Sequence, residues 1–198
     1  MRSVWLGVCL CLLFGCAATK VYVAGDYAFT GKVAVLPIAN ESNDLDGPIF
    51  VRTLIYNALA ERGFQVLPLA AIDAQLKTQG FTDGGQLGAT TPQKIGAWTG
   101  ADTLFYTTLE NFDYINVGVY AQRRVKILSK LVDAKTGERL WESEREGSTR
   151  VFAVNKKDAE TLFAAQLAIK AIEKAAHRPL QPESQTAVGL LIRDLPIR

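Results

Sequence analysis

Cysteine and histidine are scarce in this chain of 198 residues, which has three cysteines and one histidine. The cysteines (Cys9, Cys11 and Cys16) all lie in the first 16 residues, so the rest of the chain has no disulfide framework, no thiolate nucleophile and no cysteine-rich zinc site. A strong charge excess is also missing, because 22 basic and 20 acidic residues give a net charge of +2. This balance excludes a basic nucleic-acid binder that neutralises many phosphates. The chain contains 48% apolar residues, which is the composition of one globular domain with a core.

The first 15 residues have the pattern of a signal peptide. Arg2 precedes an apolar run, Val4 to Phe14, that is too short to cross a bilayer as a helix, which takes about 20 residues. The run ends in the letters LFGC, and this ending resembles the lipobox of bacterial lipoproteins. The resemblance implies cleavage before Cys16, a covalent lipid on that cysteine, and transfer to the outer membrane because Ala17 and not aspartate follows. A plain signal peptide with a chance cysteine is the alternative.

The mature chain divides into three parts by composition. Residues 16–31 show no helical period and predict a lipidated tether. Residues 32–176 carry the periodic apolar pattern of a single domain. Residues 177–198 contain three prolines and predict a C-terminal tail, packed or loose, with one helical turn at most.

Residues 32–69 predict a strand, a helix and a second strand. The letters KVAVLPI at 32–38 are almost unbroken apolar residues, as in a strand buried on both faces. A helix follows, from Asp46 as the expected N-cap to a stop at Gly63, and residues 64–69 form the second strand. Strands joined in this way run parallel. The pattern continues with two more helices and a third strand, at 70–79, 91–100 and 103–111.

Residues 119–148 predict a long antiparallel hairpin, whose turn lies at 135–137 and pairs Val132 with Leu140. This register sets two lysines opposite two glutamates: Lys126 faces Glu146 and Lys130 faces Glu142. It also places one row of apolar residues on the other face: Val125, Ile127, Leu131 and Trp141.

A last helix is predicted at 155–176, capped by Asn155. Apolar residues recur along it at helical spacing, and we expect them to face the core: Leu162, Ala165, Ile169, Ile172 and Ala176. The fold class is therefore α/β: a small sandwich with a central mixed sheet, made of a parallel βαβ core and a long antiparallel hairpin, with helices packed on its faces.

Candidate site residues follow the first strand. Asn40, Glu41, Ser42 and Asn43 come at the carboxyl end of a buried parallel strand, where open α/β sheets bind their ligands. We interpret this loop as a candidate partner-contact loop, and a turn in which Asn and Ser bond their own backbone is the alternative. His177 lies at a helix end, where the helix dipole favours it without any catalytic role. The glutamates at 142, 144 and 146 alternate on one strand face opposite lysines, which indicates a solvated ladder and not a metal site. We expect no catalytic residue, no cofactor and no metal site.

Four segments together resemble an uncharacterised family of proteobacterial outer-membrane lipoproteins that includes a neisserial antigen. They are the letters VLPIANES at 35–42, ALAERGFQVLP at 58–68, GAD at 100–102 and LVDAKTGERLW at 131–141. The family is similar in layout to the periplasmic domain of the curli secretion channel CsgG, to the amino-terminal domain of TolB and to the penicillin-binding-protein activator LpoB. The resemblance implies a domain that acts through protein contacts, and it brings no catalytic residue.

The expected function is therefore that of a protein-interaction module, anchored to the outer membrane by its lipid and facing the periplasm. It would be an accessory to an envelope assembly or secretion system, with an envelope protein as partner, no nucleic acid, and a homo-oligomer as a possibility left open. One alternative is a subunit of a CsgG-like secretion pore, which needs a second hairpin with a lipid-facing surface. The other is an envelope hydrolase, for which the chain offers no nucleophile–base pair.

Overall fold

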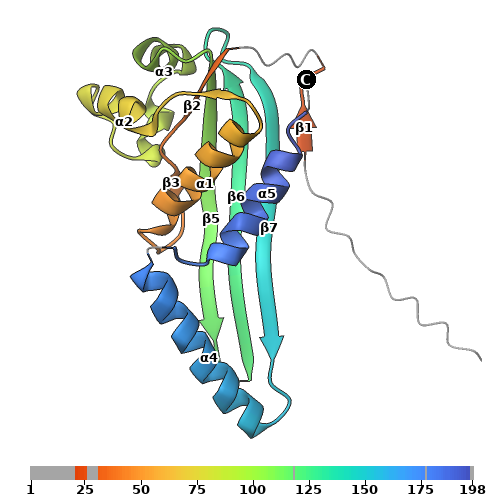
Figure 1. The fold of residues 1–198 in the computed structure, drawn as a ribbon. Helices are drawn as coiled ribbons and strands as arrows, with labels where there is room; N and C mark the ends of the chain where they lie inside the picture. The colour runs from red at the N-terminus through yellow and green to blue at the C-terminus, as the bar shows by residue number, and fades with distance from the viewer. Residues whose placement is uncertain (1–20, 26–30, 118, 177, 197–198) are drawn as a thin grey trace, which may run out of the picture.

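The computed structural model describes residues 21–25, 31–117, 119–176 and 178–196. In this part of the chain, the strands form one sheet in the order β1-β7-β6-β5-β2-β4, and β3 also pairs with β5. Strands β5, β6 and β7 run side by side along the length of the molecule (Figure 1). The strands are β1 Val21–Val23, β2 Lys32–Val35, β3 Ala39–Asn40, β4 Gln65–Val66, β5 Thr103–Asn116, β6 Tyr120–Asp133 and β7 Arg139–Phe152.

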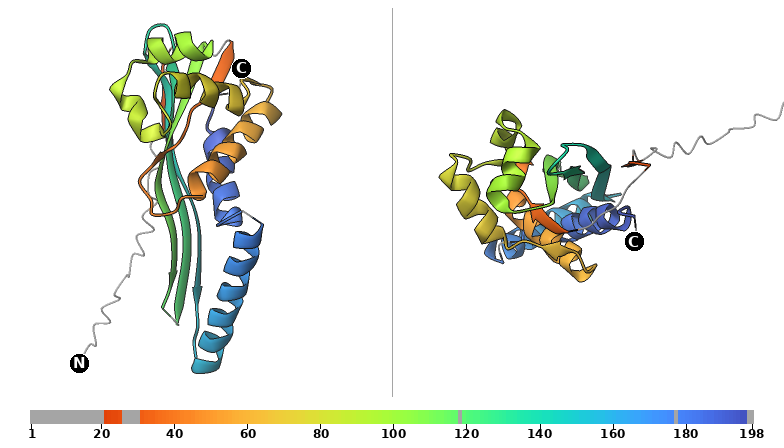
Figure 2. Two further views of the ribbon diagram at one scale, coloured as in Figure 1. Left: turned by 90° about the vertical axis from the view of Figure 1, so that its left-hand side faces the viewer. Right: turned by 90° about the horizontal axis from the view of Figure 1, so that it is seen from above.

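Helices lie on both faces of the sheet (Figure 2). They are α1 Gly47–Glu61, α2 Leu69–Thr78, the 3-10 helix η1 Gly84–Ala89, α3 Pro92–Thr99, α4 Lys156–Ala175 and α5 Gln181–Arg193. Strand β2 is parallel to β4 and β5, while β6 is antiparallel to both of its neighbours, β5 and β7. The predicted mixed sheet with a parallel βαβ core and a long hairpin is confirmed.

Two apolar clusters hold the helices to the sheet, one on each face. Val33 and Val35 of β2 point into the cluster that contains α1, α5 and Trp141. Ala34 and Leu36 point into the cluster that contains α2, η1 and α3. The predicted burial of the first strand on both faces follows from this alternation.

The first strand and the first helix differ in detail from the prediction. The predicted strand 32–38 is shorter in the structure, because β2 ends at Val35, before Pro37, which has no N–H to donate to a ladder; the separate strand β3 begins at Ala39. Asp46 was the expected N-cap of α1, but its own backbone is helical and its side chain makes no cap hydrogen bond. Asp44 takes that role, because its Oδ1 accepts hydrogen bonds from the N–H groups of Asp46 (3.0 Å) and Gly47 (2.6 Å).

The hairpin has the predicted register over most of its length. Lys126 lies opposite Glu146 and Lys130 opposite Glu142. The expected pair of Val132 with Leu140 is wrong by one residue, because an irregularity at Leu140 sets Val132 opposite Arg139.

The sequence predicted that two segments lie outside the domain, but both of them pack on it. The predicted tether 16–31 contains β1, which pairs with β7 at its outer edge. The predicted tail 177–198 contains α5, which is 13 residues long and not a single turn. The three prolines led to the prediction of a tail without a helix of this length. Pro182, however, lies in the first turn of α5, where proline is compatible with a helix. Its apolar residues at helical spacing belong to the main core: Ala187, Val188, Leu191 and Ile192.

Candidate interaction surface

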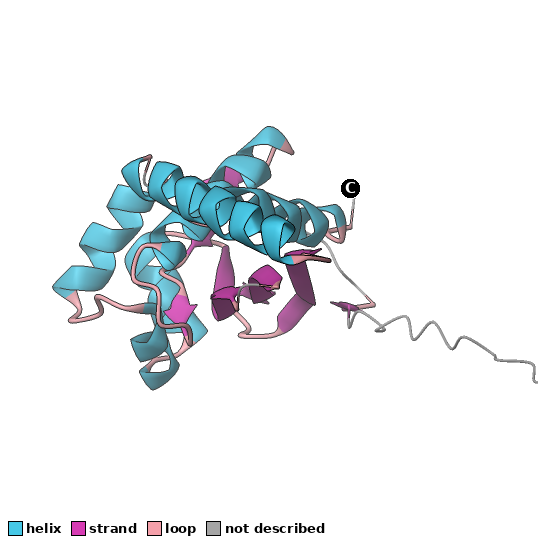
Figure 3. Ribbon diagram, turned by 90° about the horizontal axis from the view of Figure 1, so that it is seen from below, coloured by secondary structure: helices cyan, strands magenta, loops and turns pink. Residues whose placement is uncertain are grey.

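Helix α4 returns from the far end of the long strands and crosses in front of the sheet (Figures 1 and 3). Asn155 caps it as predicted, since its Oδ1 accepts a hydrogen bond of 2.9 Å from the N–H of Asp158. The helix joins β7 at one end and α5 at the other. It is 20 residues long, so its side chains decide what a large surface of the molecule offers.

The side chains of α4 are distributed against the usual rule for an amphipathic helix. Gln166, which is 6% exposed, is the buried residue of this helix. The large apolar side chains are exposed instead: Phe163 47%, Leu167 49%, Ile169 40% and Ile172 68%. The prediction that Leu162, Ala165, Ile169, Ile172 and Ala176 face the core is therefore wrong, because Leu162 is half-buried and the other four are exposed. A periodic apolar row shows that a helix has such a face, but not what covers it.

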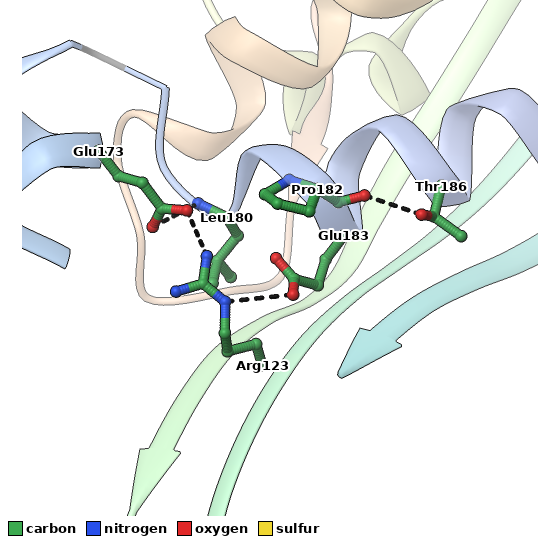
Figure 4. A network of polar contacts seen from close by, with 6 residues as sticks. All are labelled: Arg123, Glu173, Leu180, Pro182, Glu183 and Thr186. Carbon is green, nitrogen blue, oxygen red and sulfur yellow. Dashed lines mark hydrogen bonds and ion pairs between the residues drawn. The ribbon is translucent and has the colours of Figure 1, made fainter. Parts of the chain in front are cut away.

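A buried arginine holds the polar side of α4 to the sheet (Figure 4). Arg123 of β6, 5% exposed, donates from Nε to Glu183 Oε1 of α5 at 3.1 Å and from Nη2 to Glu173 Oε1 of α4. The N–H of Leu180 also donates to Glu173, at 3.3 Å. Burial by itself lowers the pKa of a guanidinium, but the hydrogen bonds and charges of Glu183 and Glu173 outweigh burial and hold the pKa of Arg123 above its ordinary value. We call Arg123, Glu173 and Glu183 the clamp.

Two residues of the clamp, Arg123 and Glu173, also line a cavity of about 450 Å³. Asn43 and Asp44 line it from the loop after β3, and Lys170 and Lys174 line it from α4. The ammonium of Lys170 lies over the ring of Tyr114 at 5.2 Å. Among the described residues, nothing accepts a hydrogen bond from Arg123 Nη1, which is buried. The cavity therefore joins the loop that the sequence indicated to the base of α4.

The predicted contact loop has two kinds of residue. Asn40 and Ser42 build the turn, because Asn40 Oδ1 accepts from Ser42 N–H (3.0 Å) and Oγ (2.7 Å), and Asn40 Nδ2 donates to the carbonyl of Asp44 (2.8 Å). Glu41 and Asn43 are exposed. The turn alternative thus explains Asn40 and Ser42, and the role of Glu41 and Asn43 in partner contact stays a prediction.

The other candidate residues are placed as follows. Cys16 and His177 lie outside the described residues. In the glutamate ladder of β7, Glu144 pairs with Lys126 at 3.1 Å and Glu142 with Arg139 at 2.8 Å. Within the described ranges, no group of three or more His, Cys, Asp or Glu side chains could hold a metal ion, and no helix is long and apolar enough to cross a membrane.

The clamp was missed in the sequence, although a signal for it exists. Arg123 stands two residues before Val125 and four before Ile127, so strand alternation puts its side chain on the apolar face. A charge at such a position needs a buried partner of opposite sign. The acidic partners come from 173 and 183, and nothing in the strand itself points to them.

Comparison with known proteins relates this chain to a protein family. A family model described as "Putative lipoprotein GNA1162-like" matches residues 28–190. The chain is 28% identical over 158 residues to "Putative lipoprotein NMB1124/NMB1162" of Neisseria meningitidis serogroup B, a match that covers 75% of this chain and 73% of that protein. Among solved structures, lipoprotein GNA1162 from Neisseria meningitidis matches with a TM-score of 0.58 and 24% identity, over 72% of this chain and 99% of that one. A PelC dodecamer from Paraburkholderia phytofirmans matches with a TM-score of 0.51 and 13% identity, over 90% and 98%. These two structures show the same fold.

Proposed function

We propose that this chain, which belongs to the GNA1162-like lipoprotein family, is a lipid-anchored interaction module of the bacterial envelope. The lipid is carried by Cys16 in the outer membrane, and the domain faces the periplasm. The module works through contacts with other protein chains, without catalysis or a cofactor, as an accessory to an envelope assembly or secretion system.

The outward apolar face of α4 carries this proposal. Full burial of a side chain such as Leu167 or Ile172 is worth about 1.5–3 kcal/mol, and the fold leaves this gain unused. Contiguous apolar surface of this kind on a small domain marks an interaction site. On the polar side of the same helix, Glu173 pairs with Arg123 of the clamp, and this ion pair fixes the orientation of α4. The apolar side of α4 therefore faces outward, where it can bind a partner.

The occupant that fits this face is a second copy of the same chain. By the helical period, Ala164, Ala168 and Ala171 form a groove of small side chains with Leu167 on one flank and Ile172 on the other. Such a face offers both ridges and a groove, so two copies can pack their α4 helices together. No charged residue lies between 160 and 170 to oppose the contact. PelC, which shares the fold, is described as a dodecamer, and this supports assembly as a use of the fold.

The test measures the mass of the mature chain in solution. The chain from Ala17 to Arg198, produced without the signal peptide and Cys16, carries no lipid and is analysed by size-exclusion chromatography with light scattering over a range of concentrations. We expect self-association that Leu167→Glu and Ile172→Glu each abolish. The matched control is Ile49→Glu, which puts the same charge at an exposed position of α1 (71% exposed) and leaves the mass unchanged. A monomer at every concentration, or the same loss in the control, would contradict the proposal.

A further inference from the structure

The far end of the long strands carries a second apolar surface, separate from the outward face of α4. Two connections meet there: the β5–β6 turn and the β7–α4 link. Their side chains are largely exposed: Val117 65%, Val119 60%, Phe152 69% and Val154 92%. We call these four residues the distal tip. Ile115 and Val151, 41% and 36% exposed, continue it on the strands behind.

The distal tip contains no charge. Residues 114–120 (YINVGVY) and 151–155 (VFAVN) are together twelve uncharged residues. Tyr114 and Tyr120 stand at the base of the turn, and the ring of Tyr120 packs on that of Phe152 at 5.0 Å. Tyrosine combines an apolar ring with a polar hydroxyl and is enriched where a protein meets the lipid–water interface.

Three backbone hydrogen bonds hold the two connections of the distal tip. The N–H of Val117 donates to the carbonyl of Tyr120 at 2.9 Å, and that of Val119 to the carbonyl of Val117 at 3.1 Å. The N–H of Ala153 donates to Val119 at 2.8 Å and so ties the two connections together. In an apolar medium an unpaired backbone group costs several kcal/mol, so internal pairing of this kind removes an obstacle to entering lipid.

Basic residues surround the distal tip. Arg150 precedes Val151 on β7, and Lys156 and Lys157 open α4 directly after the uncharged link. The nearest acidic groups on α4 are Asp158, whose carboxylate accepts a hydrogen bond from Asn155, and Glu160, 4.0 Å from Lys156. Asp113 of β5 is paired with Arg124. Lysines next to an apolar surface complement the phosphates of anionic lipids and keep their ammonium groups in water while their stems follow the apolar surface.

The direction of β1 sets the distal tip toward the same side as the anchor. Val21 pairs with Ser143 and Val23 with Trp141, so the amino-terminal end of β1 points along β7 toward Phe152. Ser143 and Phe152 are nine residues apart on β7, which is about 30 Å. The five residues from Cys16 to Val21 span at most about 18 Å. At the limit of this reach, about 12 Å would separate the anchored cysteine from the level of the distal tip.

We propose that the distal tip inserts into the surface of an anionic phospholipid bilayer, as a second membrane contact beside the lipid on Cys16. The proposal rests on the lipid anchor of the proposed function only for the orientation of the domain.

The test uses the chain from Ala17 to Arg198, without signal peptide or lipid, and flotation with vesicles of phosphatidylethanolamine and phosphatidylglycerol. We expect binding that falls at least tenfold in Phe152→Ser/Val154→Ser. The matched control is Leu45→Ser/Ile49→Ser, which removes apolar side chains of similar exposure (84% and 71%) from another surface and binds as before. Lys156→Gln/Lys157→Gln lowers binding severalfold, and vesicles of phosphatidylcholine alone show the same reduction with the unchanged chain.

A second readout reports insertion directly. Phe152→Trp places a fluorophore at the tip; Trp141 is fully buried and Trp98 of α3 is half-buried, and the emission of the unchanged chain is subtracted. We expect a blue shift of the added emission when vesicles are present. Absence of flotation and of this shift would overturn the proposal. So would loss of self-association in Phe152→Ser/Val154→Ser without any change in flotation, which assigns the tip to a second copy. The mass test of α4 depends on Leu167→Glu and Ile172→Glu, which leave the distal tip unchanged, so failure of one proposal is distinguishable from failure of the other.

Discussion

Replacement of Arg123 by methionine measures how strongly the clamp holds α4 and α5 to the sheet. The substitution keeps an apolar stem of similar length and removes the charge, so Glu173 and Glu183 lose their shared partner. Glu183 is 3% exposed and the side chain of Glu173 is 13% exposed, so neither carboxylate is well solvated. Breaking a buried ion pair from one side costs about 3–5 kcal/mol in free energy of unfolding.

Urea unfolding followed by tryptophan fluorescence, from Trp141 and the half-buried Trp98, reports this change. Trp141 is fully exposed to quenching only when the core opens, because in the fold it is buried against Phe105. With a slope of about 2 kcal/mol per M urea, the midpoint falls by about 1.5–2.5 M. Arg124→Met is the matched control: the next residue lies on the other face, 32% exposed, and pairs with Asp113, 37% exposed. Its loss is at most about 1 kcal/mol, since water screens such pairs.

The reasoning also predicts a rescue. Glu173→Gln and Glu183→Gln, added to Arg123→Met, remove the unpaired charges and recover at least half of the lost free energy. An Arg123→Met loss no larger than that of Arg124→Met refutes the clamp. Absence of any rescue shows that the arginine acts by packing and not by its charge.

Four further predictions concern single positions. Gly147→Ala lowers the free energy of unfolding by about 3 kcal/mol, because the added Cβ would lie 2.0 Å from the carbonyl oxygen of Glu183. Gly189→Ala has nothing within 4 Å of its added Cβ and raises the free energy of unfolding by about 0.5–1 kcal/mol through α5. Thermal unfolding of both variants checks this. Burial raises the pKa of Tyr106 from 10.0 to about 12, so the free energy of unfolding is unaffected below pH 10 and falls as the pH rises from 10 to 12. Alkaline spectrophotometric titration should show one tyrosine that ionises later than the others, and Tyr106→Phe should remove it. Cys16→Ser leaves unprocessed precursor and releases the domain from the outer membrane, as fractionation and intact mass would show; normal fractionation would contradict the lipid anchor. Asn40→Ala costs about 1–2 kcal/mol because two donors of the turn lose their acceptor, and an unchanged midpoint in urea would contradict this.

The sheet and most helices could be predicted because their signals are local. Residues 32–38 show the apolar run of a buried strand, and the lysine–glutamate pairs fix the hairpin register through neighbours in the ladder. Helix α3 has Thr91 at its start, where the hydroxyl accepts from Lys94 N–H, and Gly100 in the left-handed conformation at its end. Each of these decisions needs only residues close together in the sequence.

The surface of α4 and the clamp could not be predicted, because they depend on residues far apart. The apolar row of α4 looks the same in the sequence whether it packs on its own sheet or on another chain. Its orientation is decided by Arg123, 50 residues before Glu173 and 60 before Glu183. Helix α5, and not α4, packs on the sheet beside Gly147. A side chain at position 147 would collide with the backbone of α5.

The pairing of β1 with β7 also bears on solubility. Within the described ranges, β1 pairs with residues 141–143 of β7, and no described strand pairs with this edge of β7 from Glu144 onward. An open edge of this length is a template for strand addition and fibril growth. Here Glu144, Arg145, Glu146 and Arg150 place charges along it, and stacking of identical strands would bring equal charges together. Association of copies through strand pairing is therefore disfavoured, which keeps a protein concentrated at a membrane surface from polymerising along its own sheet.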